Sequence, residues 1–159
     1  EKNKAIAVEA SPRVYPLLKE NVSLNQFEDR IECLDIAAGR EDSTITFDMG
    51  PKGETGWGGI TQRMSDASTV TVNQRPLDDI IDERIRFLKI DVEGADTWVL
   101  QRAKNLLKSK AIDCIQFEHN IARAAKLGID EEEPFRFLEK VGYEVDRKEG
   151  DHWAYPKEK

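Results

Sequence analysis

The fold is decided by residues 87–96, which read FLKIDVEGAD. This is an apolar run that ends abruptly in two carboxylates and a glycine, and residues with helical spacing follow it. That order is typical of a buried parallel strand that leads into a crossover helix. Gly94 allows the backbone to turn closely between the two elements. One long helix is predicted from a single apolar stripe, which consists of Ala95, Trp98, Val99, Ala103, Leu106 and Leu107.

Three predicted strands end in polar side chains. They lie in residues 4–9, 87–96 and 111–118, and a helix over residues 12–25 follows the first of them. In open α/β sheets, ligands bind outside the carboxyl ends of the strands. A polar cluster at one end of a sheet is therefore the default prediction for a site. The polar residues at these ends are Glu9, Asp91, Glu93, Glu118 and His119.

Two pairs of segments are predicted to form antiparallel hairpins. Residues 43–49 and 68–75 alternate polar and apolar side chains with a period of two, which is typical of strands with one wet face. Residues 143–147 and 152–155 form the closing hairpin of the sheet. The glycine-rich loop at 50–65, with Trp57 inside it, is either a mobile lid over a substrate or a hairpin connection without fixed structure.

Length and composition set the broad class of protein. The 159 residues are the size of one domain, and the net charge of −7 argues against a nucleic-acid or anionic-membrane surface. No apolar run approaches the roughly 18 to 20 residues that span a bilayer, and no signal peptide is recognised, so a cytoplasmic protein is expected. Cys33 and Cys114 lack the spacing of metal ligands and are predicted to be buried thiols.

The central motif resembles the FkbM family of S-adenosylmethionine-dependent methyltransferases. The resemblance rests on LKIDVEGAD at residues 88–96, PLDD at 76–79 before it, and the apolar pairs at 99–100 and 106–107 after it. It extends from about Ala5 to Tyr143. It implies a single, partial α/β domain over residues 1–159, with a Rossmann-like class I methyltransferase sheet, an inserted antiparallel hairpin and a C-terminal antiparallel hairpin.

The resemblance also implies where S-adenosylmethionine binds. The tip of the second strand would hold the ribose and the next turn would lie along the adenine, so that the implied cofactor residues are Glu9, Ala10, Asp35, Ile36, Ala37 and Asp91. Each acid also has a structural interpretation. Glu9 is otherwise a solvated strand-end carboxylate, and Asp35 is otherwise a turn-forming residue, so both interpretations stay open.

The family usually transfers a methyl group to a hydroxyl oxygen, and this implies a catalytic carboxylate. Asp91 would be the general base or an orienting hydrogen-bond acceptor, and Glu93, Glu118 and His119 are the further catalytic candidates. A lone histidine is more often structural than catalytic. A metal held by Asp91 and Glu118 has no ligand spacing to support it, so no metal is predicted.

The sequence departs from the family pattern at its beginning. The family's first strand and glycine-rich turn are not in these residues, and the chain begins at Glu1 without a methionine. We therefore expect a truncated domain with a vacant strand position between the strands that carry Glu9 and Asp91. We also expect this part alone to bind the cofactor weakly or not at all.

The predicted function is methylation of a hydroxyl on a small molecule or glycan. No nucleic-acid or membrane partner is expected, and a homodimer is the assembly considered. The alternative from another functional class is a truncated, inactive domain that serves as a binding module. A nicotinamide-dependent oxidoreductase is a weaker third interpretation, because residues 88–96 match methyltransferases instead.

Overall fold

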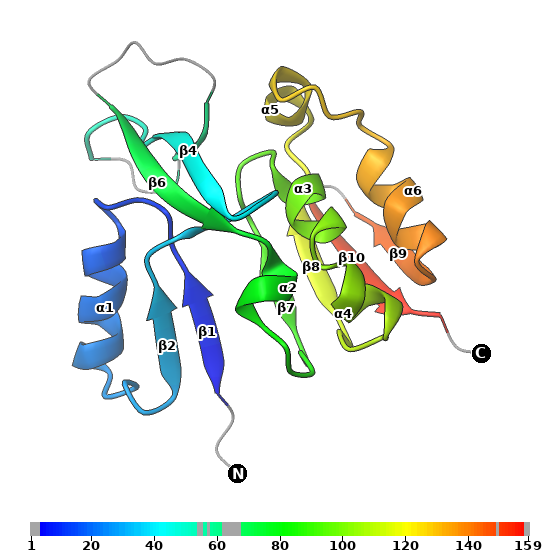
Figure 1. The fold of residues 1–159 in the computed structure, drawn as a ribbon, viewed down its shortest axis with the longest axis horizontal. Helices are drawn as coiled ribbons and strands as arrows, with labels where there is room; N and C mark the ends of the chain where they lie inside the picture. Colours follow the sequence, from blue (N-terminus) through cyan, green and yellow to red (C-terminus); the bar gives the residue numbers. More distant parts are fainter. Residues whose placement is uncertain (1–3, 54–55, 57, 62–67, 149, 158–159) are drawn as a thin grey trace. The chain divides into compact units, whose positions relative to one another are not determined.

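The computed structural model describes residues 4–53, 56, 58–61, 68–148 and 150–157 (Figure 1). The chain forms two compact units. The first comprises Glu1–Ala38 and Asp42–Arg75, and the second comprises Gly39–Glu41 and Pro76–Lys159.

The first unit begins with a parallel strand–helix–strand arrangement. Strand β1 (Ala5–Val8) pairs in parallel with β2 (Ile31–Leu34), and helix α1 (Tyr15–Leu24) connects them. The helix was predicted to begin at Pro12, but residues 12–14 form a turn, in which the backbone carbonyl of Ser11 accepts the N–H groups of Val14 and Tyr15. Pro16 is the proline that occupies the first helical turn, where its missing N–H costs no hydrogen bond.

A second sheet of the first unit has the order β3-β6-β4-β5. The predicted hairpin forms as β4 (Ser43–Asp48) paired antiparallel with β6 (Thr69–Arg75). Ala37 does not continue β2 but begins β3 (Ala37–Ala38), which pairs in parallel with β6. The backbone leaves β2 after Leu34 because Ala37 has a different strand partner from the residues before it.

The predicted loop at residues 50–65 contains a short strand of its own. This strand, β5 (Gly59–Ile60), pairs antiparallel with β4 through Phe47 and Asp48. Gly58 packs so closely on Phe47 that an added Cβ would lie 2.8 Å from its ring. Trp57, the predicted lid contact, lies outside the described residues.

The second unit is built on a four-stranded sheet with the order β7-β8-β10-β9. Strand β7 (Leu88–Ile90) runs parallel to β8 (Ile115–Glu118), and β10 (Asp151–Pro156) pairs antiparallel with both β8 and β9 (Tyr143–Arg147). The apolar core of this unit includes the fully buried side chains of Leu100, Leu107, Ile112, Ile115, Phe117, Leu138 and Tyr143.

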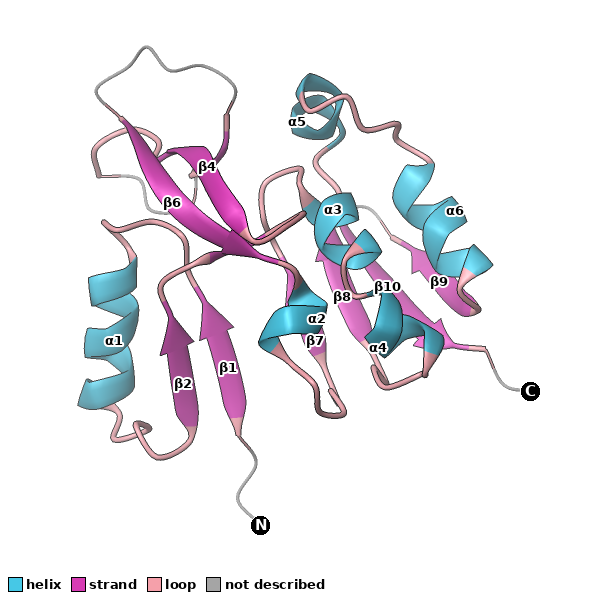
Figure 2. Cartoon of the chain, in the orientation of Figure 1, coloured by secondary structure: helices cyan, strands magenta, loops and turns pink. Residues whose placement is uncertain are grey.

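Among the described residues of the second unit, five helices accompany the sheet. Figure 2 shows α3 (Asp96–Gln101), α4 (Lys104–Lys108) and α6 (Glu133–Lys140) on one face of its sheet, and α3 packs against α6. The other two are α2 (Leu77–Ile80) and α5 (Ile121–Lys126).

The single helix predicted after residue 95 is two helices, α3 and α4, with a break at Arg102 and Ala103. The reason is Asp78 of α2. Its carboxylate accepts the backbone N–H of Asn105 at 2.8 Å and that of Leu106 at 3.1 Å. Because the first N–H groups of a helix lack partners within it, a carboxylate at this point stabilises a new helix start. The apolar stripe continues across the break, which is why the sequence did not reveal it.

Strands β1 and β7 belong to different sheets, and each pairs with one neighbour among the described strands, β1 with β2 and β7 with β8. A vacant strand position between them stays a prediction.

Candidate functional site

The loop after β7 carries the central motif. Asp91 is exposed just beyond the last residue of this strand, and its Oδ2 lies 2.9 Å from Nζ of Lys89. The backbone then adopts positive φ at Glu93 (53°) and at Gly94 (95°). A non-glycine residue in that region is uncommon and carries backbone strain, so the loop is held by its surroundings.

An acidic cluster forms at the carboxyl ends of β7 and β8. Burial raises the pKa of Glu118, and the negative charges of Asp91, Glu93 and Asp151 raise it further. The hydrogen bond from Lys89 to Asp91 is the main cause that raises the pKa of Lys89. The structure therefore brings together three of the predicted catalytic residues, Asp91, Glu93 and Glu118. We call Asp91, Glu93, Glu118 and Asp151 the acidic cluster.

Asp151 is a member of this cluster that the sequence analysis missed. It begins β10 and lies opposite Glu118 in the antiparallel register of β10 and β8. Its position depends on a pairing between strands far apart in the sequence. No local signal in residues 148–156 could have identified it.

Glu93 also contacts helix α5. Its Oε2 lies 3.4 Å from Nε of Arg123, and both side chains are half-buried. The same helix lies against Gly94, where an added Cβ would be 2.6 Å from Cβ of Arg123. The motif loop is thus packed directly on α5, a helix that the sequence analysis did not predict.

Asp96 organises the motif loop and was not identified from the sequence. Its side chain is 1% exposed, and its carboxylate accepts the backbone N–H of Val92 at 3.4 Å and that of Gly94 at 3.2 Å. Burial raises the pKa of Asp96 to about 7, against the lowering effect of these N–H groups, and the charge of Asp91 contributes to the rise. The sequence signal that could have identified Asp96 is an acid directly after Gly-Ala at the start of a predicted helix.

His119 lies apart from the acidic cluster. Its ring is buried, with Nε2 3.0 Å from the carbonyl oxygen of Glu131 and an edge-on contact to Phe135. Burial lowers the pKa of His119, and its nearby charges are Glu131 and Glu132. Nδ1 of His119 is buried and has no hydrogen-bond partner within the described part of the chain, so a catalytic role for this residue stays a prediction.

The predicted cofactor residues of the first unit directly follow the carboxyl ends of β1 and β2. Oε1 of Glu9 accepts the backbone N–H of Ser11 at 2.7 Å. Burial raises the pKa of Glu9, and the negative charge of Asp35 contributes, so these two acids are neighbours. Ala10 and Ile36 are half-buried and Ala37 is buried.

Two features of this region bear on whether a ribose fits it. The buried hydroxyl of Ser11 has no hydrogen-bond partner within the described part of the chain, and Glu9 is fixed by the backbone beside it. A buried polar atom without a partner is uncommon and calls for an explanation. A ribose offers hydroxyl groups that can donate to a carboxylate and pair with a serine hydroxyl, so the residues present fit that group.

Among the described residues, no group of three or more His, Cys, Asp or Glu side chains is arranged to hold a metal ion. Both cysteines are free and partly exposed, not buried as predicted. No helix in the described part of the chain is long and apolar enough to cross a membrane.

Comparison with known proteins gives consistent matches. A family model described as the methyltransferase FkbM domain matches residues 1–145. Among solved structures, the fold is similar to the crystal structure of methyltransferase FkbM from Methylobacillus flagellatus, with a TM-score of 0.63 and 16% sequence identity. That alignment covers 96% of this chain and 36% of the other, so this chain spans about a third of that protein. No match is found among curated proteins.

Proposed function

This chain belongs to the FkbM methyltransferase family, and from that premise we propose that it takes part in methyl transfer from S-adenosylmethionine to a hydroxyl oxygen of a small molecule or glycan. The observation that carries the proposal is the acidic cluster, which stands at the carboxyl ends of parallel strands, where α/β folds bind their ligands. The net charge of −7 supports an acceptor that is not a nucleic acid.

S-adenosylmethionine, when bound, supplies an activated methyl group. On the side of this chain, Glu9 and Ser11 would hold the ribose hydroxyls, and Asp35 with Ile36 and Ala37 would lie along the adenine. The backbone N–H of Ser11 already orients the Glu9 carboxylate, so little rotational freedom is lost when a ligand binds.

Asp91 is the residue we assign to the acceptor hydroxyl. Its side chain is exposed at the edge of the sheet, and its Oδ2 lies 2.9 Å from Nζ of Lys89. A carboxylate there can accept a hydrogen bond from the hydroxyl and take its proton as the new O–C bond forms. Glu118, whose pKa is raised by burial, is a second acid within the same cluster.

The proposal predicts that Asp91→Asn lowers methyl transfer more than it lowers cofactor binding. A base or orienting acceptor acts chiefly in the transition state, so kcat should fall by about tenfold or more while the Kd of S-adenosylmethionine stays nearly constant. The measurement is transfer of labelled methyl from S-adenosylmethionine to a library of hydroxylated acceptors, with the protein in its complete natural form.

Glu144→Gln is the matched control. Glu144 is exposed on β9, and its substitution removes one negative charge at a position outside the acidic cluster. Full activity in Asp91→Asn would show that the chemistry lies elsewhere. Cofactor binding without transfer to any acceptor would favour the alternative of an inactive binding module.

A second prediction tests the cofactor assignment. Loss of a charge-assisted hydrogen bond costs about 1.5 to 3 kcal/mol, so Glu9→Gln should weaken binding of S-adenosylmethionine about tenfold or more. Calorimetric titration measures this, with Glu20→Gln on the exposed face of α1 as control. Equal affinity of Glu9→Gln and the unmodified protein would remove Glu9 from the site.

A further inference from the structure

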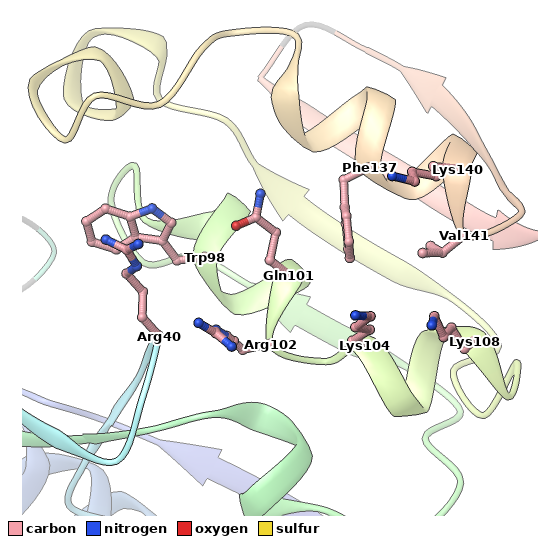
Figure 3. A pocket seen from close by; sticks show the side chains of 9 residues that line it. All are labelled: Arg40, Trp98, Gln101, Arg102, Lys104, Lys108, Phe137, Lys140 and Val141. Carbon is pink, nitrogen blue, oxygen red and sulfur yellow. The ribbon is translucent and has the colours of Figure 1, made fainter.

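The second unit contains a cavity of about 670 Å³ between helices α3, α4 and α6 (Figure 3). We call it the basic groove. All of its lining residues belong to this unit, and they share no member with the acidic cluster. They are Arg40, Trp98, Gln101, Arg102, Lys104, Lys108, Phe137, Lys140 and Val141.

The basic groove concentrates positive charge on a chain whose net charge is −7. Of the described residues that line it, none is acidic. Within the described part of the chain, no ion pair or hydrogen bond engages the side chains of Arg102, Lys104, Lys108 or Lys140. Lys104 and Lys108 also stand one turn apart on α4, a spacing at which like charges repel. The spacing of these two lysines therefore costs folding stability instead of adding to it.

The walls of the basic groove strengthen its attraction for anions. The side chain of Phe137 points into the space between α4 and α6, with Val141 beside it (Figure 3). At the other end, the guanidinium of Arg40 lies over the ring of Trp98, 4.8 Å from its centroid. A cleft lined by charges of one sign and walled by apolar groups focuses the electric field and attracts counter-ions more strongly than a flat surface does.

We propose that the basic groove binds a small organic molecule that carries two or more phosphate groups. Lysines act as point charges for phosphate and arginine offers a fork of donors, so the lining residues can engage phosphates from two sides. The volume of about 670 Å³ is that of a small-molecule site. An extended polyanion such as duplex DNA would be repelled by the rest of this acidic chain.

The test uses fructose 1,6-bisphosphate as the probe and calorimetry at low ionic strength, with fructose as the uncharged comparison. The double variant Lys104→Gln/Lys140→Gln removes one charge from each side of the basic groove, and we expect it to weaken binding about tenfold or more. The double variant Lys104→Arg/Lys140→Arg keeps both charges and should keep most of the affinity. All four substitutions are at exposed positions, and thermal unfolding checks that each variant folds.

The matched control is Lys19→Gln/Lys126→Gln, which makes the same change in net charge on α1 and α5. Unchanged affinity in that control supports the proposal. Equal weakening in both glutamine variants would show that only the overall charge matters, and absence of binding to the unmodified protein would overturn the proposal outright. Tighter, Lys104- and Lys140-dependent binding of duplex DNA or phosphatidylserine vesicles would replace the small molecule with a macromolecular partner.

Discussion

Replacement of Gly94 by alanine is expected to lower the free energy of unfolding by about 3 to 5 kcal/mol, because backbone strain and overpacking act together at this position. The φ angle of Gly94 is +95°, a conformation that residues with a side chain rarely adopt. The new Cβ would lie 2.6 Å from Cβ of Arg123 and 2.7 Å from the backbone nitrogen of Ala124. Helix α5 would have to move away from the motif loop to admit it. Urea denaturation of both proteins measures the loss.

Gly128→Ala separates the two causes. Gly128 has a φ of +76°, but an added Cβ there meets no atom within 4 Å. We expect this control to lose only about 1 kcal/mol, from backbone strain alone. Similar losses in the two variants would mean that α5 yields easily and that the close approach at Gly94 contributes little.

Asp96→Asn is expected to change how stability depends on pH. Burial raises the pKa of Asp96 from an ordinary value of 3.8 to about 7, so the folded state binds its proton more tightly than the unfolded state does. The stabilisation linked to this proton is complete below about pH 4 and is lost as the pH rises through about 7. The shift of about three units corresponds to a loss on the order of 4 kcal/mol across that interval.

The measurement is urea denaturation of the unmodified protein and Asp96→Asn at several pH values between 4 and 8. Asparagine offers one acceptor oxygen to the two N–H groups of Val92 and Gly94, so the variant should be the less stable protein at pH 5. Because it does not titrate, the difference should shrink or reverse by pH 8. Asp82→Asn, at an exposed position, controls for loss of a charge. Parallel pH profiles for the unmodified protein and Asp96→Asn would show that the buried carboxyl is not protonated in the folded state.

Several features of this protein could be predicted from local sequence. Residues 87–96 predict a strand, a tight turn at Gly94 and a helix, and the same string predicts the FkbM family. Residues 43–49 and 68–75 predict paired strands through their period-two pattern, and they pair as β4 and β6. These predictions succeed because each depends on residues a few positions apart in the sequence. The patterns are the alternation of polar and apolar side chains along a strand, the apolar stripe along a helix and the glycine at a tight turn.

The candidate site required more than local sequence. Asp91 follows β7 directly and Glu118 is the last residue of β8, so their meeting at one sheet edge could be predicted from parallel pairing. Asp151 joins them only because β10 pairs antiparallel with β8 in one register. His119 follows Glu118 directly, yet its ring packs on Phe135 of α6, and a lone histidine in sequence gives no sign of that environment.

By itself the sequence determined the family, the central strand–turn–helix and the acids that end its strands. Tertiary structure decided the division of the predicted helix by Asp78, the burial of Asp96 and the gathering of Arg102 with the lysines of α4 and α6 around one groove. The physical reason is how far apart in the sequence the interacting residues lie. Hydrophobic period and backbone conformation depend on nearby residues, whereas a pKa, a capping carboxylate from another helix and a charged groove depend on groups that only folding brings into contact.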